Sequence, residues 1–173
     1  MDDGFQNRKI HKDLEIVALT SATSSEKVFR DWPSSLKRAN LLVWTKGLKR
    51  PATFGVPLVK VKYRLPKNPF PSDVLFWLVT GIGDGESACA LMKESGYPVL
   101  RHLVFRDHES YDKQKVETLM REASLAGCRI ILTGKDWVKW KDLGVQKTHV
   151  VVLEPEIIFE EGRENWSKLL WEK

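Results

Sequence analysis

Cysteine is scarce in this chain, and its scarcity argues against two classes of protein. The 173 residues contain two cysteines, Cys89 and Cys128, and four scattered histidines. A disulfide-stabilised secreted domain needs more cysteines, and a structural zinc site needs more ligands at shorter spacing. Both cysteines lie in apolar stretches, so we expect reduced core side chains, as in a cytoplasmic protein.

Long apolar runs are also missing. The longest, residues 74–80 extended through 81–83, is about half the roughly 20 residues that a membrane-spanning helix needs. No charged-then-apolar signal segment stands at the amino terminus. We therefore expect a soluble or peripheral protein.

Basic residues are in excess but form no long tract. The formal net charge is +5, with local density at residues 8–12 and 46–50. This balance suits a phosphorylated ligand or an anionic membrane face. Because no helix-turn-helix, zinc-finger or RNP pattern occurs, nucleic acid is not an expected partner.

A P-loop is absent as well. No G-x-x-x-x-G-K-[ST] string occurs, and the nearest segment, Thr133–Asp136, lacks the upstream glycine and the hydroxyl that would hold magnesium. The sequence therefore predicts no phosphate-binding loop for ATP within these residues.

What is present begins with a pair of carboxylates, Asp2 and Asp3, followed by Gly4. Adjacent side chains on a strand point in opposite directions, so the two converge on one cation only where the backbone turns, and glycine permits that turn. Mg²⁺ prefers such oxygen ligands together with phosphates and water. The alternative interpretation is a solvated turn without a ligand.

Apolar patterning predicts an α/β fold. Short apolar runs alternate with segments of helical periodicity, which is typical of a parallel sheet with right-handed crossovers. The expected strands are residues 14–19, 41–45, 74–79, 99–105, 129–133 and 150–153, and the expected helices are 87–95, 112–126, 135–143 and 164–171. Five prolines bracket the alternating residues 58–63, so we expect residues 56–72 to be an extended linker between two domains.

Five ordered motifs resemble one family. Residues 2–14, Asp-Asp-Gly-Phe-Gln-Asn-Arg-Lys-Ile-His-Lys-Asp-Leu, resemble the DDGFQH(R/K)xLxRDL signature of the tetraacyldisaccharide 4'-kinases, which act in lipid A synthesis. Residues 30–39, 81–83, 105–108 and 133–139 resemble later motifs of that family in the same order. Departures include Asn7 for histidine and Arg106 for proline, and the family's P-loop is missing.

The resemblance implies the second part of a kinase. Residues 1–55 would be a remnant of a P-loop-kinase-like nucleotide-binding domain, residues 73–158 a small Rossmann-like parallel-sheet domain, and residues 159–173 an amphipathic terminal helix. The missing amino-terminal P-loop half would be a partner. The isolated chain would then be an inactive portion of the enzyme, working at the cytoplasmic face of the inner membrane.

The resemblance also implies site residues. Asp2 and Asp3 would hold Mg²⁺, with Asp3 also beside the transferred phosphoryl group. Asp2 and Gln6 would line the ATP site, Arg30 would meet the phosphate of the lipid A disaccharide precursor, and His108 would assist deprotonation of the attacking sugar hydroxyl. Lys135 and Asp136 match a motif to which we assign no chemical role.

Two alternatives remain open from the sequence. A non-catalytic α/β module could bind a lipid phosphate or a protein partner without nucleotide chemistry. A dinucleotide enzyme could use the turn at Gly81–Gly85, although Glu86 stands where the third glycine of G-x-G-x-x-G belongs, so a tight turn is the simpler interpretation.

Overall fold

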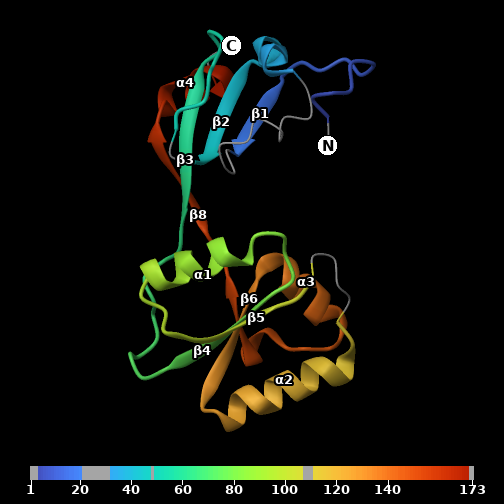
Figure 1. The fold of residues 1–173 in the computed structure, drawn as a ribbon, viewed down its shortest axis with the longest axis vertical. Helices are drawn as coiled ribbons and strands as arrows, with labels where there is room; N and C mark the ends of the chain where they lie inside the picture. The colour runs from blue at the N-terminus through green and yellow to red at the C-terminus, as the bar shows by residue number, and fades with distance from the viewer. Residues whose placement is uncertain (1–3, 21–31, 48, 107–110, 172–173) are drawn as a thin grey trace. The chain divides into compact units, whose positions relative to one another are not determined.

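The computed structural model describes residues 4–20, 32–47, 49–106 and 111–171. The chain divides into two compact units. Unit 1 comprises Met1–Lys62 and Ile157–Lys173, and unit 2 comprises Tyr63–Glu156 (Figure 1). Because unit 1 is built from both ends of the sequence, the chain passes between the units twice.

Unit 1 contains a four-stranded sheet in the order β1-β2-β3-β8. β2 pairs in parallel with β1 on one side and with β3 on the other. The strands are β1 (Ile16–Thr20), β2 (Leu41–Lys46), β3 (Leu58–Arg64) and β8 (Glu156–Glu161), and a 3-10 helix, η2 (Pro33–Arg38), precedes β2.

Alternation along β2 supplies both faces of this sheet. Leu42 and Trp44 pack into one cluster with Leu36 of η2, whereas Leu41 contributes to a second cluster on the other face. Burial on both faces explains why β2 is a nearly continuous apolar run.

The terminal helix α4 (Arg163–Trp171) covers the second face of the unit 1 sheet. Its Trp166 and Leu169 pack against Val59 and Val61 of β3 and against Phe159 of β8. The apolar side of this amphipathic helix is therefore accounted for by its packing on the protein.

Unit 2 contains a parallel sheet in the order β5-β4-β6-β7. Successive residues of the central strand β4 face opposite layers: Phe76 and Leu78 join Cys89 and Met92 of α1, and Trp77 and Val79 join the cluster of α2 and α3. The strands are β4 (Leu75–Thr80), β5 (Val99–Val104), β6 (Cys128–Thr133) and β7 (Val150–Leu153), and the helices are α1 (Gly85–Glu94), α2 (Lys113–Leu125), α3 (Gly134–Asp142) and the 3-10 helix η3 (Lys147–His149).

The described fold is thus mixed α/β with parallel sheets, and it differs from the expected organisation in two segments. Within the expected linker 56–72, residues 58–64 form strand β3, and β8 is a strand that the sequence analysis did not anticipate. Leu58 and Val59 are buried on opposite faces and pair with β2. The flanking prolines therefore delimit a strand, and this strand also carries the chain from unit 1 to unit 2 between Lys62 and Tyr63.

Candidate functional site

Asp136 lies at the centre of the carboxyl edge of the unit 2 sheet. Its side chain is fully buried. Its Oδ1 accepts hydrogen bonds from the backbone N–H of Gly81 at 2.9 Å and from the hydroxyl of Tyr111 at 3.0 Å, and its Oδ2 accepts from the hydroxyl of Thr133 at 2.6 Å. A buried carboxylate needs such donors to replace its lost hydration. Asp136 therefore connects the ends of β4 and β6 with Tyr111, two residues before α2.

The sequence around Asp136 explains its position. Thr133 ends β6 and caps α3, because its Oγ1 accepts the backbone N–H of Asp136 at 3.3 Å. Threonine followed three residues later by an acidic residue is the spacing of a capping box. That spacing was a signal for this pair, although it could not predict the contacts with Gly81 and Tyr111.

Gly81 is required for the close approach between the β4 turn and this carboxylate. A Cβ added at Gly81 would lie 2.7 Å from the Tyr111 hydroxyl oxygen and 2.9 Å from Oδ1 of Asp136. At the start of α1, Asp84 caps the helix by accepting the N–H of Ser87 at 3.1 Å, which places an acidic group where a pyrophosphate would bind. The described residues therefore favour a tight turn over a dinucleotide site.

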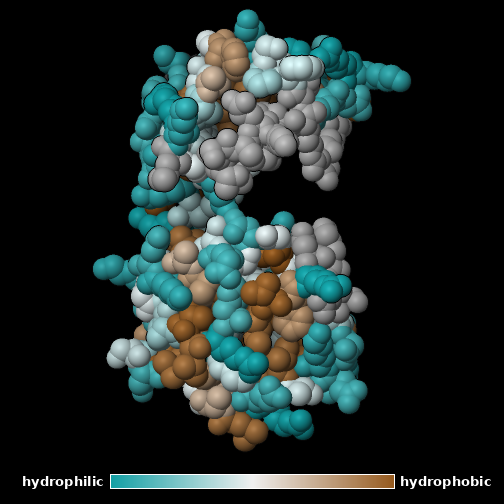
Figure 2. Space-filling view, viewed as in Figure 1, coloured by the Kyte–Doolittle hydropathy of each residue, from teal (hydrophilic) through white to brown (hydrophobic). Residues whose placement is uncertain are grey.

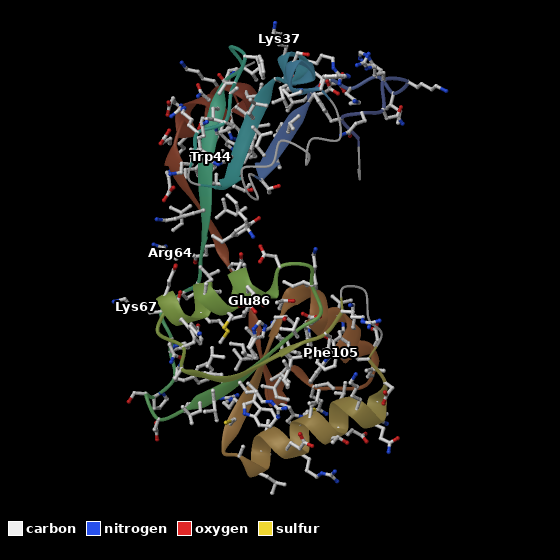
Figure 3. The ribbon with its side chains drawn as sticks, viewed as in Figure 1. Lys37, Trp44, Arg64, Lys67, Glu86 and Phe105 are labelled. Atoms are coloured by element: carbon white, nitrogen blue, oxygen red, sulfur yellow. The ribbon has the colours of Figure 1, made fainter. Side chains whose placement is uncertain are left out.

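Aromatic contacts fix Phe105 and Tyr111, which lie on either side of His108 in the sequence. The Phe105 ring lies 5.1 Å from the Tyr111 ring, and Tyr111 lies 5.7 Å from the fully buried Trp140, both edge-to-face. The backbone N–H of Phe105, labelled in Figure 3, donates to the carbonyl of Thr80 at 2.7 Å. Phe105 and Tyr111 are therefore both fixed at the carboxyl edge of this sheet.

A second polar cluster lies between β4, β5 and α1. Nε2 of His102 is 2.9 Å from Oγ1 of Thr80, and Nδ1 is 3.8 Å from Oε1 of Glu86, labelled in Figure 3. Burial lowers the pKa of His102, Lys93 lowers it further, and the carboxylate of Glu86 opposes the shift. Thr80 is fully buried, so its hydroxyl is not an accessible nucleophile. Sequence reasoning missed this cluster, because only the folded sheet brings the residues together.

In unit 1, Gln6 is the predicted site residue that falls within the described part of the chain. It lies exposed in a turn that the N–H of Asn7 closes by donating to the carbonyl of Gly4 at 3.2 Å. Phe5 packs against the core of the sheet, and the Arg38 guanidinium lies 4.5 Å from its ring centroid. The segment after the double aspartate is therefore anchored beside the end of η2.

The other predicted site residues, Asp2, Asp3, Arg30 and His108, lie outside the described residues. The structure therefore places one of the predicted site residues, Gln6, and brings none of them together. In residues 4–20, 32–47, 49–106 and 111–171, no three acidic, histidine or cysteine side chains are grouped to hold a metal ion. The same residues include no helix with the length and hydropathy to cross a bilayer.

The whole pattern of motifs is matched by one family model. The model for tetraacyldisaccharide-1-P 4'-kinase matches residues 1–172. The chain belongs to this family. Two curated members, the tetraacyldisaccharide 4'-kinases of Chlorobium limicola and Geobacter metallireducens, are each 30% identical to it over 164 residues, which is 80% of this chain and 47% and 48% of the relatives.

A solved structure of the same family shares the fold. The "apo" form of LpxK from Aquifex aeolicus, crystallised in complex with ATP, is 25% identical and superposes with a TM-score of 0.66, covering 99% of this chain and 56% of that protein. The present family member therefore spans about half the length of the relatives it matches.

Proposed function

We propose that this chain is part of an ATP-dependent kinase that phosphorylates the 4'-hydroxyl of a tetraacyldisaccharide 1-phosphate in lipid A synthesis. The observation that carries the proposal is the family match over residues 1–172. Relatives named tetraacyldisaccharide 4'-kinase and the ATP complex of the Aquifex aeolicus protein support it. Because the chain covers about half of them, the activity belongs to an assembly that includes the unmatched part.

The two units receive different roles in this proposal. Unit 1 is part of a P-loop-kinase-like domain, with the nucleotide phosphates held by the polypeptide that this chain does not match. Unit 2 is a small Rossmann-like domain and supplies His108. What supports this division is that each unit has a sheet of its own, in which β1, β2 and β3 of unit 1 and β5, β4, β6 and β7 of unit 2 pair in parallel.

The residues near the amino terminus provide a donor set that fits Mg²⁺. Asp2 and Asp3 offer carboxylate oxygens, which this ion prefers, and Gln6, exposed in its turn, offers an amide to the same pocket. When bound, the ion would neutralise charge on the phosphates. Phosphoryl transfer otherwise depends mainly on positioning and electrostatics, so the role of these side chains is to orient the phosphates.

Arg30 binds the sugar substrate, and His108 acts on its 4'-hydroxyl. A guanidinium binds phosphate through two parallel hydrogen bonds, which suits Arg30 to the anionic disaccharide. His108 assists removal of the proton of the 4'-hydroxyl as the oxygen forms its bond to the γ-phosphorus and the bond from the γ-phosphorus to the β-phosphate oxygen breaks. The substrate carries acyl chains, so we place the assembly at the cytoplasmic face of the inner membrane.

A transfer assay tests the proposal. The chain is combined with the part of the Chlorobium limicola kinase that it does not match, and transfer of radiolabelled phosphate from ATP to the disaccharide is measured. We expect turnover by the assembly and negligible turnover by the chain alone. Asp3→Asn and His108→Ala should each reduce turnover by about 10²- to 10⁴-fold, whereas His149→Ala, an exposed histidine in η3, should not.

Two results would overturn this assignment. Turnover by the 173-residue chain without the added part would show that no other nucleotide-binding half is needed. An assembly that binds ATP but transfers no phosphate to the disaccharide would refute the kinase function itself.

A further inference from the structure

Residues 4–15, which lead into strand β1, contain no helix or strand, so their position depends on a few side chains. Gly4 and Phe5 are half-buried, and residues 6–11 are exposed. Figure 2 shows mainly hydrophilic side chains over this part of unit 1, which is the blue segment between the end marked N and β1 in Figure 1. A local hydrogen bond from the N–H of Asn7 to the carbonyl of Gly4 closes one turn. Contacts with the rest of unit 1 are therefore needed to fix the segment.

One end of the segment is bound to the residue before β2. The backbone N–H of Asn40 donates to the carbonyl of Glu15 at 2.8 Å, and the N–H of Glu15 donates to Oδ1 of Asn40 at 2.8 Å. Lys12 also forms an ion pair with the Glu15 carboxylate. These bonds fix the entry into β1, but they lie at the opposite end of the segment from Gln6.

The other end is held by Arg38 and Phe5. The Phe5 ring packs against the cluster that contains Leu36 and Trp44, and the Arg38 guanidinium lies 4.5 Å from the centroid of that ring. Nη2 of Arg38 also donates to the carbonyl oxygen of Phe5, at 3.5 Å. A cation is attracted to the face of an aromatic ring, and the planar guanidinium can stack on the ring while it donates hydrogen bonds. Arg38 therefore contacts both the side chain and the backbone of Phe5.

The position of Arg38 is set by the 3-10 helix η2 rather than by the segment. Arg38 is the last residue of η2, in which Leu36 is buried in the same cluster. Nε of Arg38 is buried, whereas the neighbouring Lys37, labelled in Figure 3, is exposed. A positive charge that served only the end of this helix would be as effective on Lys37. The contact with Phe5 is what distinguishes Arg38.

Phe5 stands between the residues to which the proposed function assigns Mg²⁺ and ATP. Asp3 is two residues before it, and Gln6 follows it. Successive Cα atoms are about 3.8 Å apart, so the Cα of Asp3 lies within about 7.6 Å of the Cα of Phe5. We propose that Arg38 is a positioning residue that, by holding Phe5, orients Gln6 and the double aspartate toward the metal ion. This inference rests on the proposed function, because that proposal assigns the ion to Asp2 and Asp3.

Manganese binding tests this role. Mn²⁺ is the probe in place of Mg²⁺, because electron paramagnetic resonance measures the free ion directly, and it is added to the 173-residue chain. We expect Arg38→Gln and Phe5→Leu each to weaken Mn²⁺ binding by about 10- to 100-fold, as is usual when a residue that orients a metal ligand is removed. The double variant should bind as either single variant does, since both changes remove the same contact. Phe5→Tyr, which keeps the ring, should bind as the parent does.

The direction of the change separates positioning from charge. Removing a positive charge near an acidic site should by itself strengthen the binding of a divalent cation. Weaker binding by Arg38→Gln therefore reports lost positioning, and unchanged or tighter binding would overturn the inference. Losses that multiply in the double variant would also overturn it, as would an equal loss in the matched control Lys37→Gln, which removes an exposed charge from the same turn. If the parent chain binds no Mn²⁺, there is no ion to orient and the inference is wrong.

Two further measurements exclude a purely structural role. Circular dichroism verifies that each variant is folded during the titration; Arg38→Lys, which keeps the charge without the planar group, replaces an unfolded Arg38→Gln, and Phe5→Leu decides if neither folds. In the assembly with the unmatched part of the Chlorobium limicola kinase, Arg38→Gln should lower kcat by about 10- to 100-fold and leave KM for the disaccharide unchanged. Weakened Mn²⁺ binding in an assembly whose parent form transfers no phosphate would refute the proposed function and leave the role of Arg38 intact. Phosphate transfer and Mn²⁺ binding at parent levels in Arg38→Gln would do the reverse.

Discussion

Replacing Asp136 with alanine should destabilise unit 2 by about 3 to 5 kcal/mol. Three donors, the N–H of Gly81 and the hydroxyls of Tyr111 and Thr133, would lose their acceptor in a site that water does not reach. A buried donor left without a partner costs about 1 to 3 kcal/mol. We use the lower part of the summed range, because each hydroxyl can rotate and the vacated space can admit water.

A double-mutant cycle separates this network from a general effect of truncation. Tyr111→Phe removes one donor to a charged acceptor and should cost about 1.5 to 3 kcal/mol. In the Asp136→Ala background the same change should cost much less, since the hydroxyl no longer has that acceptor. Asp142→Ala removes an exposed carboxylate at the end of the same helix and should stay within about 0.5 kcal/mol of the parent.

The assay must report on unit 2 alone, because two units need not unfold together. Hydrogen exchange of peptides covering β4 and β6, measured in increasing urea, gives the free energy of opening for that sheet. A loss below about 1 kcal/mol for Asp136→Ala would refute the reasoning, given the cost expected for even one unpaired donor. An equal cost of Tyr111→Phe in both backgrounds would also refute it.

Two other predictions concern unit 2. Burial lowers the pKa of His102, so the unfolded state binds more protons in the window between the folded pKa and about 6.5. Stability should be constant above that window, fall as the pH falls through it, and level off below the folded pKa. Glu86→Gln should enlarge the loss of stability, because the Glu86 carboxylate raises the pKa of His102, and His102→Gln should remove that loss. Urea midpoints measured between pH 5 and 8 report this stability. An unchanged pH dependence in His102→Gln would contradict the prediction. In the second prediction, Gly81→Ala should lower the free energy of unfolding by about 1 to 3 kcal/mol, because the added Cβ would meet Tyr111 and Asp136. The control Gly134→Ala should be nearly neutral, because a Cβ there would have nothing within 4 Å. Equal urea midpoints for the two variants would show that the close approach at Gly81 is not required.

Strands and helices with a strong apolar pattern could be predicted from the sequence. The buried run at 74–79 became β4 at Leu75–Thr80, and the periodic segment 112–126 became α2 at Lys113–Leu125. Such segments bury enough apolar surface that local pattern and tertiary position agree. The parallel pairing in unit 2 followed from the same alternation of strands and helices.

Strand β8 could not be predicted, because its stability depends on residues far away in the sequence. Its Glu-Ile-Ile-Phe-Glu-Glu pattern is strongly acidic. The carboxylate of Glu160 meets Lys60 at 2.9 Å and Lys62 at 2.8 Å on β3, and hydrogen bonds from Lys62 and Lys60 lower its pKa. Cross-strand pairs of this kind exist only once the two strands are neighbours.

Part of the candidate site, like part of the fold, could be predicted from the sequence, and part could not. A motif match pointed to Thr133–Asp136 without a role, and the contacts to Gly81 and Tyr111 supply one that is structural. The Thr80 and His102 pair had no sequence signal, because a polar residue on a strand does not reveal its neighbour. The roles of Asp2, Asp3, Arg30 and His108 stay predictions.

The discontinuity of unit 1 has a consequence for synthesis on the ribosome. Unit 2 is one uninterrupted stretch, Tyr63–Glu156, and can acquire its native contacts while residues 157–171 are still being translated. The fourth strand and covering helix of unit 1 come from Glu156–Glu161 and Arg163–Trp171. Nascent β1, β2 and β3 therefore remain incompletely covered until residues 156–171 have been translated.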